Sequence, residues 1–258
     1  MTVRYLEVSA LSHDGLVRGH NEDSLVVGPW TLCAATTLSP QTLYFPVGDP
    51  VVVAVADGLG GHPGGEEASS LAVSHLARIG AGLVDEDAIL EAVLACNDVV
   101  NAEASRHPDR VAMGTTLAGI VVTDELVFTF NVGDSRVYLV DGTRLERLST
   151  DDNEPALPGG RRSSVVTQSL GGTVLARPVA PHISSRPLAD GSRFLVCSDG
   201  LTDAVDEPEI AAILDEHDGG RSIFELWRAT IEAGAPDNVT IALAEVSGEV
   251  DSSADVRS

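Results

Sequence analysis

The sequence has 258 residues, of which 39 are acidic and 16 are basic, so its formal net charge is −23. A chain this acidic repels nucleic acid and anionic membrane surfaces, and we exclude both as partners. Hydrophobic residues make up 43% of the chain, enough for a sizeable core. Every basic residue is Arg, so a permanent cation that grips a phosphate has to be an arginine.

The three cysteines are odd in number, far apart and without a CxxC pair. They predict neither a disulfide framework nor a zinc site and fit a reducing compartment. No stretch reaches the roughly 18 apolar residues of a membrane span, and the first residues lack an apolar signal region. We therefore expect a cytoplasmic protein.

The first half of the chain predicts strands followed by two helices. Apolar patterns indicate strands at residues 3–10, 25–27 and 51–57, the last of them apolar on both faces. Residues 28–50 contain four prolines and no clear period, and we expect a loop or an insertion there. Helical periodicity predicts helices over 68–79 and 85–105.

The second half repeats this order. Strands are predicted at 115–122, 126–132, 137–140, 143–148, 165–170, 193–197 and 239–246. Residues 149–163 predict an exposed loop, and helices are predicted at 207–216 and 221–233. Two helix pairs among hairpins predict an α+β fold with mainly antiparallel sheets and helices packed outside. We expect one domain over residues 1–246 and a disordered tail over 247–258.

Aspartates stand at the ends of several predicted strands. They are Asp23, Asp57 (followed by Gly58), Asp134, Asp199 with nearby Asp203, and Asp237. Each one alone is weak evidence, because Asp is common in turns. If they converge on one rim, their mutual repulsion raises their pKa values and destabilises the fold. A cluster of hard divalent cations resolves that conflict, and all-oxygen ligands favour Mg²⁺ or Mn²⁺ over Zn²⁺.

Six segments, in order, resemble the motifs of the protein phosphatase 2C family, the metal-dependent Ser/Thr phosphatases. They are DGLVRGHNEDS (14–24), VADGLGGH (55–62), MGTT (113–116), VGDSR (132–136), SDGLTD (198–203) and PDNVT (236–240). The match runs from residue 12 to residue 246, and the DGxGGH form is similar to the bacterial branch. The resemblance implies a four-layer α-β-β-α sandwich, two mainly antiparallel sheets flanked by helix pairs.

The resemblance also implies roles for single residues. Asp57 would bridge two Mn²⁺ or Mg²⁺ ions, the Gly58 carbonyl would bind one of them, and Asp199 and Asp237 would bind the other. Glu22 and Asp23 would hold metal-bound waters, and Arg18 would grip the substrate phosphate. A weaker third site would use Asp134, Asp199 and Asp203.

The implied function is hydrolysis of phosphoserine and phosphothreonine in proteins by a water that bridges the two ions, without a covalent intermediate. The substrate would be a phosphoprotein, the protein a monomer, and its action would oppose a bacterial Ser/Thr kinase. One alternative is a phosphoprotein of an anti-sigma pathway as substrate. Another is a pseudophosphatase that binds phosphoprotein without hydrolysis, which predicts lost ligands, although Asp57, Asp199 and Asp237 are intact. A purely structural acidic protein leaves the ordered motifs unexplained.

The sequence departs from the family pattern in two places. Leu59 stands where some animal relatives have a histidine acid, so a metal-bound water would protonate the leaving group; His62 is a substitute acid or simply part of a glycine-rich loop. The flap at 149–164 is short, which leaves substrate gating and the third metal open. Arg161 and Arg162 in that flap either contact phosphopeptide or belong to a solvated loop.

Overall fold

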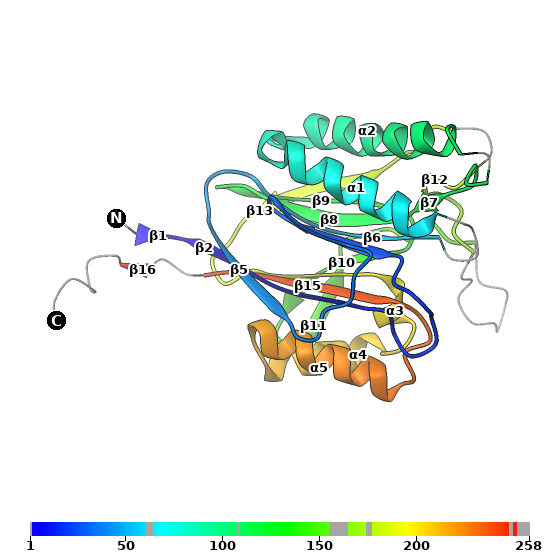
Figure 1. Ribbon diagram of the computed structural model, residues 1–258. Coiled ribbons are helices and arrows are strands. Elements are labelled where there is room, and N and C mark those ends of the chain that lie inside the picture. Colours follow the sequence, from blue (N-terminus) through cyan, green and yellow to red (C-terminus); the bar gives the residue numbers. More distant parts are fainter. Residues whose placement is uncertain are drawn as a thin grey trace.

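The computed structural model describes residues 2–59, 64–107, 109–154, 165–173, 177–247 and 250–251. Its centre is two six-stranded antiparallel sheets that pack face to face, with helices on both outer faces (Figure 1). The predicted four-layer α-β-β-α sandwich is therefore confirmed.

The first sheet carries the buried strand that ends in Asp57. Its strand order is β13 (His182–Pro187), β9 (Leu126–Val132), β8 (Leu117–Val122), β6 (Val51–Asp57), β3 (Asp23–Val27) and β4 (Trp30–Cys33). Strand β6 is central, paired with β3 on one side and β8 on the other. It is buried on both faces, which explains why its sequence is continuously apolar rather than alternating.

The second sheet lies beneath the first. Its strand order is β11 (Arg144–Arg147), β10 (Arg136–Asp141), β14 (Arg193–Cys197), β15 (Val239–Val246), β2 (Tyr5–His13) and β5 (Gln41–Pro46). Two short ladders complete the strands: β7 (Gly114–Thr115) pairs with β12 (Leu170–Gly171), and β1 (Thr2–Val3) pairs with β16 (Val250–Asp251).

The helices cover the outer faces of the sheets. Helices α1 (Gly65–Ile79) and α2 (Glu86–Ala104), joined through the short η1 (Gly80–Gly82), lie on the first sheet. Helices α3 (Asp199–Thr202), α4 (Glu207–Glu216) and α5 (Gly219–Glu232) lie on the second. Asp85 caps α2 by accepting from the Ala88 amide, and Asp206 caps α4 by accepting from the Glu209 amide.

Alternation along β6 divides the core into layers. Val53 and Val55 face the second sheet, where they pack with Val196 and Ala242 in the layer between the sheets. Val52, Ala54 and Ala56 face α1 and α2. A third cluster joins α4 and α5 to the second sheet. Burying each large aliphatic side chain contributes about 1.5–3 kcal/mol, so the layers hold the strand ends of one rim in fixed positions.

The structure corrects the prediction for residues 28–50. They do not form a plain loop but contribute two edge strands, β4 on the first sheet and β5 on the second. The segment therefore crosses from one sheet to the other. Its prolines are compatible with this because an edge strand leaves one row of backbone groups unpaired.

Three further differences concern short or polar strands. Strand β13 was not expected, and the strand predicted at 165–170 is reduced to a bridge from Val166 to Asn153 and the short β12. The predicted tail is not wholly irregular, because Val250–Asp251 pair with Thr2–Val3. Residues 248–249 and 252–258 of that tail lie outside the described part of the chain.

Candidate metal centre

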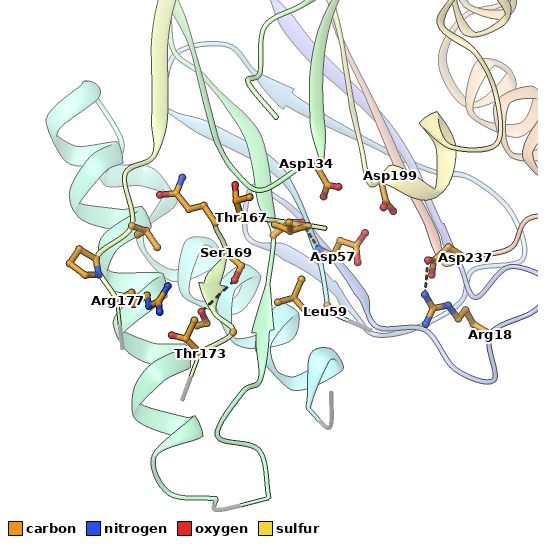
Figure 2. Close-up of a pocket in the computed structure, with 18 residues that line it drawn as sticks. Arg18, Asp57, Leu59, Asp134, Thr167, Ser169, Thr173, Arg177, Asp199 and Asp237 are labelled. Carbon is orange, nitrogen blue, oxygen red and sulfur yellow. Dashed lines mark hydrogen bonds and ion pairs between the residues drawn. The ribbon is translucent and has the colours of Figure 1, made fainter. Parts of the chain in front are cut away.

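Aspartates from four strand ends line one pocket at the rim where the two sheets meet. Asp57 ends β6, Asp134 follows β9, Asp199 follows β14 and Asp237 precedes β15, and all four line a cavity of about 610 Å³. Figure 2 shows these carboxylates converging from separate elements. Four of the six aspartates named from the sequence therefore converge on this pocket, whereas Asp23 and Asp203 are not among its lining residues.

The backbone of Asp57 is fixed by the segment that carries the Met-Gly-Thr-Thr sequence. Its amide donates to Thr116 Oγ1 at 3.1 Å, and its carbonyl accepts from the Thr116 amide at 2.8 Å and from Thr115 Oγ1 at 2.9 Å. Thr116 Oγ1 in turn shares a hydrogen bond of 2.7 Å with Ser135. The carboxylate of Asp57 thus starts from a backbone with little freedom.

Asp23 lies directly opposite Asp57 in the ladder between β3 and β6. It is 1% exposed, and its Oδ2 accepts from Ser198 Oγ at 2.8 Å. Its Oδ1 is buried and has no hydrogen-bond partner among the described residues. An unsatisfied buried carboxylate oxygen is costly, and it indicates a polar group that the protein atoms do not supply.

The loop that carries Arg18 is tied to the turn that carries Asp237 by one buried amide side chain. Asn238 accepts from the Glu22 amide at 2.8 Å and donates to the carbonyls of Asp14 and His20 at 3.0 Å each. Gly15 lies against the same turn with φ at +75°, and a Cβ there would stand 2.2 Å from the Asp237 carbonyl oxygen. A side chain at Gly15 would push the two segments apart.

Arg18 and Asp237 form an ion pair at the edge of the pocket. Arg18 Nη2 donates to Asp237 Oδ2 at 2.6 Å, and the Asp237 Oδ1 accepts from the Asn238 amide at 2.8 Å. The hydrogen bond that Arg18 donates to Asp237 raises the pKa of Arg18, so the guanidinium keeps its full charge. The arginine thus stands beside the carboxylate cluster with part of its guanidinium exposed.

The electrostatics of the cluster agree with the repulsion expected from the sequence. Burial raises the pKa of Asp57 well above its ordinary value, and the charges of Asp23 and Asp199 raise it further. Burial and the charge of Asp134 raise the pKa of Asp199 to about 8. Burial likewise raises the pKa of Asp23 to about 6 and shifts Asp134 in the same direction. With a pKa of about 8, Asp199 holds a proton at neutral pH, and a cation that binds the cluster would compete with protons for all four carboxylates.

The remaining predicted site residues lie at different depths. Glu22 is buried beside the cluster but does not line the pocket, whereas the backbone of Gly58 does. A Cβ at Gly58 would stand 2.5 Å from Gly65, so this glycine is also required by packing. Asp203 is exposed at the end of α3, outside the pocket lining, and its charge raises the pKa of Asp134 and Asp199. His62, Arg161 and Arg162 lie outside the described residues.

Two features near the site were not predicted from the sequence. His20, Glu22 and Glu66 place their ligand atoms within 4.8 Å of one another. Arg177 lines the far side of the pocket. Glu66 directly follows the glycines at the start of α1, close to the DGLGGH motif, and this position in the sequence could have indicated it as a residue near the site. Arg177 lies in a segment without periodicity, and no local pattern indicates it.

The residues present fit a pair of hard divalent cations. The donor set consists of carboxylates and the Gly58 carbonyl, with an orphaned buried oxygen on Asp23 beside them. Oxygen ligands of this kind suit Mg²⁺ and Mn²⁺. The raised pKa values also favour bound cations, because several buried carboxylates without a counter-charge destabilise a fold.

Known proteins are similar to this chain in sequence and in fold. The family model described as protein phosphatase 2C matches residues 44–246. A serine/threonine protein phosphatase, PstP, of Mycobacterium tuberculosis is 31% identical over 256 residues, 93% of this chain and 45% of that protein. A serine/threonine phosphatase of Listeria monocytogenes is 30% identical over 220 residues, 76% of this chain and 84% of that one.

A crystal structure of the PstP catalytic domain in complex with two manganese ions superimposes with a TM-score of 0.77 at 30% identity, covering 95% of this chain and 100% of that one. The chain belongs to the protein phosphatase 2C family. It spans about half the length of PstP, the first curated relative it matches.

Proposed function

We propose that this chain hydrolyses phosphoserine and phosphothreonine in proteins with the help of two Mn²⁺ or Mg²⁺ ions. The single observation that carries the proposal is the convergence of four strand-end aspartates, two of them with strongly raised pKa values, on one pocket that also holds Arg18. Its family membership and the names of its relatives as serine/threonine phosphatases support the same activity.

The residues divide the work as follows. Asp57, Asp199, Asp237 and the Gly58 carbonyl would hold the two ions, and Asp134 with Asp203 would contribute to a weaker third site beside Asp199. When bound, such ions lower the pKa of a coordinated water and neutralise charge on the phosphoryl oxygens. Arg18 binds the phosphate through its planar fork of donors, and this contact strengthens as the transferred phosphoryl group gains charge.

Glu22 and Asp23 lie next to the residues that would bind the ions and have a different role. Asp23 accepts a hydrogen bond from Ser198 and lies opposite Asp57, and its Oδ1 has no partner among the described residues, so it can accept a proton or orient a water at that oxygen. Glu22 is fixed through its amide by Asn238, and its side chain is buried beside His20 and Glu66. We assign both residues to positioning water rather than to direct binding of substrate.

The catalytically silent alternative is not supported. A protein that only binds phosphoprotein has no need for a complete set of buried carboxylates, whose repulsion reduces stability. Here Asp57, Asp134, Asp199 and Asp237 all face the pocket.

The activity is tested with p-nitrophenyl phosphate and a phosphothreonine peptide. We expect hydrolysis of both in Mn²⁺, loss of hydrolysis after EDTA, and recovery when Mn²⁺ is added back. Turnover that is equal with and without the chelator would contradict a metal-dependent reaction. Hydrolysis of the small ester but of no phosphopeptide would contradict a protein substrate.

Several finer points belong to the same proposal. We infer that residues 1–246 form one catalytic domain, that the protein acts as a cytoplasmic monomer in signalling, and that it opposes a bacterial Ser/Thr kinase. The bacterial relatives named as serine/threonine phosphatases support a role opposite a Ser/Thr kinase. The three free cysteines support a reducing, cytoplasmic compartment. Among the described residues no helix is long and apolar enough to cross a membrane. A comparison of phosphoproteins in cells with and without the protein identifies the substrates.

A further inference from the structure

The pocket extends well beyond the carboxylate cluster. Its volume of about 610 Å³ lies in the range of cavities that hold whole ligands, about 300–1,000 Å³, and not only a phosphoryl group. On the side away from the aspartates its wall is made by two segments, 166–173 and 177–179. Figure 2 shows Arg18 and Arg177 at opposite sides of this space, with Ser169 and Thr173 near Arg177.

This second half of the pocket is polar, and among the described lining residues it carries one charge. Thr167, Ser169 and Thr173 contribute hydroxyl groups, and Arg177 contributes a guanidinium. The wall can therefore donate hydrogen bonds to an extended peptide and attract an anion at one end.

The state of Arg177 is unusual for this chain. Acidic residues outnumber basic ones by 39 to 16, and most described arginines pair with a carboxylate. Within the described ranges, the side chains of Arg144 and Arg177 have neither a hydrogen bond nor an ion pair. Arg144 lies on the exposed edge strand β11, whereas Arg177 lines the pocket. An exposed guanidinium on the pocket wall, without a partner among the described residues, is available to a substrate.

The backbone of Arg177 and of the residues that follow it is held by two side chains from other parts of the fold. The Gln168 side chain accepts from the Ala180 amide at 2.6 Å and donates to the Ala180 carbonyl at 3.1 Å. Asn97 of α2 donates to the Arg177 carbonyl at 3.5 Å and accepts from the Gly171 amide at 2.9 Å. The following residue is Pro178, whose ring fixes its own φ. These bonds couple the position of Arg177 to the helix layer and to the pocket wall.

We propose that Arg177 forms a subsite for a second anionic group of the substrate, either an Asp or Glu side chain or a second phosphate close to the phosphorylated residue. This inference rests on the proposed function. Arg177 is a specificity-determining residue here, because it binds a part of the peptide that does not react. The guanidinium suits both groups, since carboxylate and phosphate each accept two parallel hydrogen bonds from arginine.

The test uses a series of phosphothreonine peptides in which one flanking residue is varied among Ala, Glu and phosphoserine. This variable residue is placed in turn at each position on either side of the phosphothreonine. For the native chain in Mn²⁺ we expect one or two positions at which Glu or phosphoserine raises kcat/KM roughly three- to tenfold over Ala. The preference should act mainly on KM and shrink with added salt, because the pair is exposed. If Glu gives the larger preference, the second anionic group of the natural substrate is an acidic side chain; if phosphoserine does, it is a second phosphate.

In Arg177→Ala the ratio of kcat/KM for the acidic peptide to that for the alanine peptide should fall toward one, and in Arg177→Glu it should fall below one. The matched control is Arg144→Ala, which removes an equally unpaired and exposed arginine and changes the net charge by the same amount; its ratio should equal that of the native chain. A ratio unchanged in Arg177→Ala, or lowered equally in Arg144→Ala, overturns the subsite alone. No hydrolysis of any phosphopeptide by the native chain overturns the proposed function and the subsite with it.

Discussion

At the level of single residues, Asp57 carries a carboxylate that lowers the stability of the metal-free fold and that the proposed function requires. Burial and the neighbouring charges of Asp23 and Asp199 raise its pKa, so the metal-free fold keeps a proton on a carboxyl group that the unfolded chain would release. A cation bound at Asp57 would take the place of that proton and offset the repulsion from Asp23 and Asp199.

We therefore expect Asp57→Asn to stabilise the metal-free protein and to abolish its response to metal. The amide has the same shape and no charge, so the melting temperature without metal should rise by a few degrees at pH 7.5. The increase that Mn²⁺ produces in the native chain should disappear together with hydrolysis. Differential scanning calorimetry with and without Mn²⁺ measures both effects.

The control for this change is Asp98→Asn, on the exposed face of α2. It removes the same charge away from the pocket and should leave the metal response unchanged. Full turnover or a native metal response in Asp57→Asn would exclude Asp57 as the central ligand.

At the level of elements, the site depends on how closely a short helix approaches a turn. Helix α3 begins with Asp199, and its second residue, Gly200, packs against the segment that follows Asp237. A Cβ at Gly200 would stand 1.9 Å from the Asn238 carbonyl oxygen. The missing side chain therefore sets the separation between two of the four pocket aspartates.

Gly200→Ala should weaken metal binding as well as stability. The clash has to be relieved by backbone movement, which we expect to cost about 1–3 kcal/mol of unfolding free energy. Because that movement separates Asp199 from Asp237, the Mn²⁺ affinity in isothermal titration calorimetry should fall. Gly82→Ala, where nothing lies within 4 Å of the added Cβ, is the control and should change neither quantity. Native Mn²⁺ affinity in Gly200→Ala would show that this approach does not position the site.

For the whole molecule, the cluster predicts an unusual dependence of stability on pH. The pKa of Asp199 is about 8 and that of Asp23 about 6 in the fold, against an ordinary value of 3.8. Between these values the folded state binds more protons than the unfolded state, so unfolding free energy falls as pH rises. Below pH 3.8 both states hold the protons and this penalty is absent.

The metal-free chain should therefore melt at a higher temperature at pH 5 than at pH 8, by roughly 5–10 °C for a loss of a few kcal/mol. Saturating Mn²⁺ should reduce or reverse this slope, because metal binding replaces protons and strengthens as pH rises. Asp199→Asn should flatten the metal-free slope. A melting temperature that rises from pH 5 to pH 8 without metal, in both the native chain and Asp199→Asn, would contradict the raised pKa values.

Much of the fold was predictable because its central strands are long and apolar. Strands β6 and β15 and both helices of the first layer appear within a few residues of their predicted bounds. What was missed are edge strands. Residues 30–33 and 41–46 lie among prolines, and β13 reads His-Ile-Ser-Ser-Arg-Pro. An edge strand pairs with a neighbour on one side only and is less buried than a central strand, so its side chains need not be apolar. The local sequence therefore does not distinguish such strands from loops.

The site was predictable to the extent that it resides in local motifs. The aspartates at the ends of β6, β9 and β14 follow their strands in the sequence, and the family resemblance assigned their roles. The pairing of Asp23 with Asp57 depends on the register between β3 and β6, which is a property of the sheet. The segment of Arg177 is held beside the pocket by hydrogen bonds with Asn97 and Gln168, and these are long-range contacts that no local pattern encodes.

The most direct measurement of the central claim is anomalous diffraction from crystals of the full chain grown with Mn²⁺. We expect two strong manganese peaks among the carboxylates of Asp57, Asp199 and Asp237 and the Gly58 carbonyl, with Arg18 beside them. Crystals in excess Mn²⁺ whose carboxylates enclose no anomalous peak would contradict it.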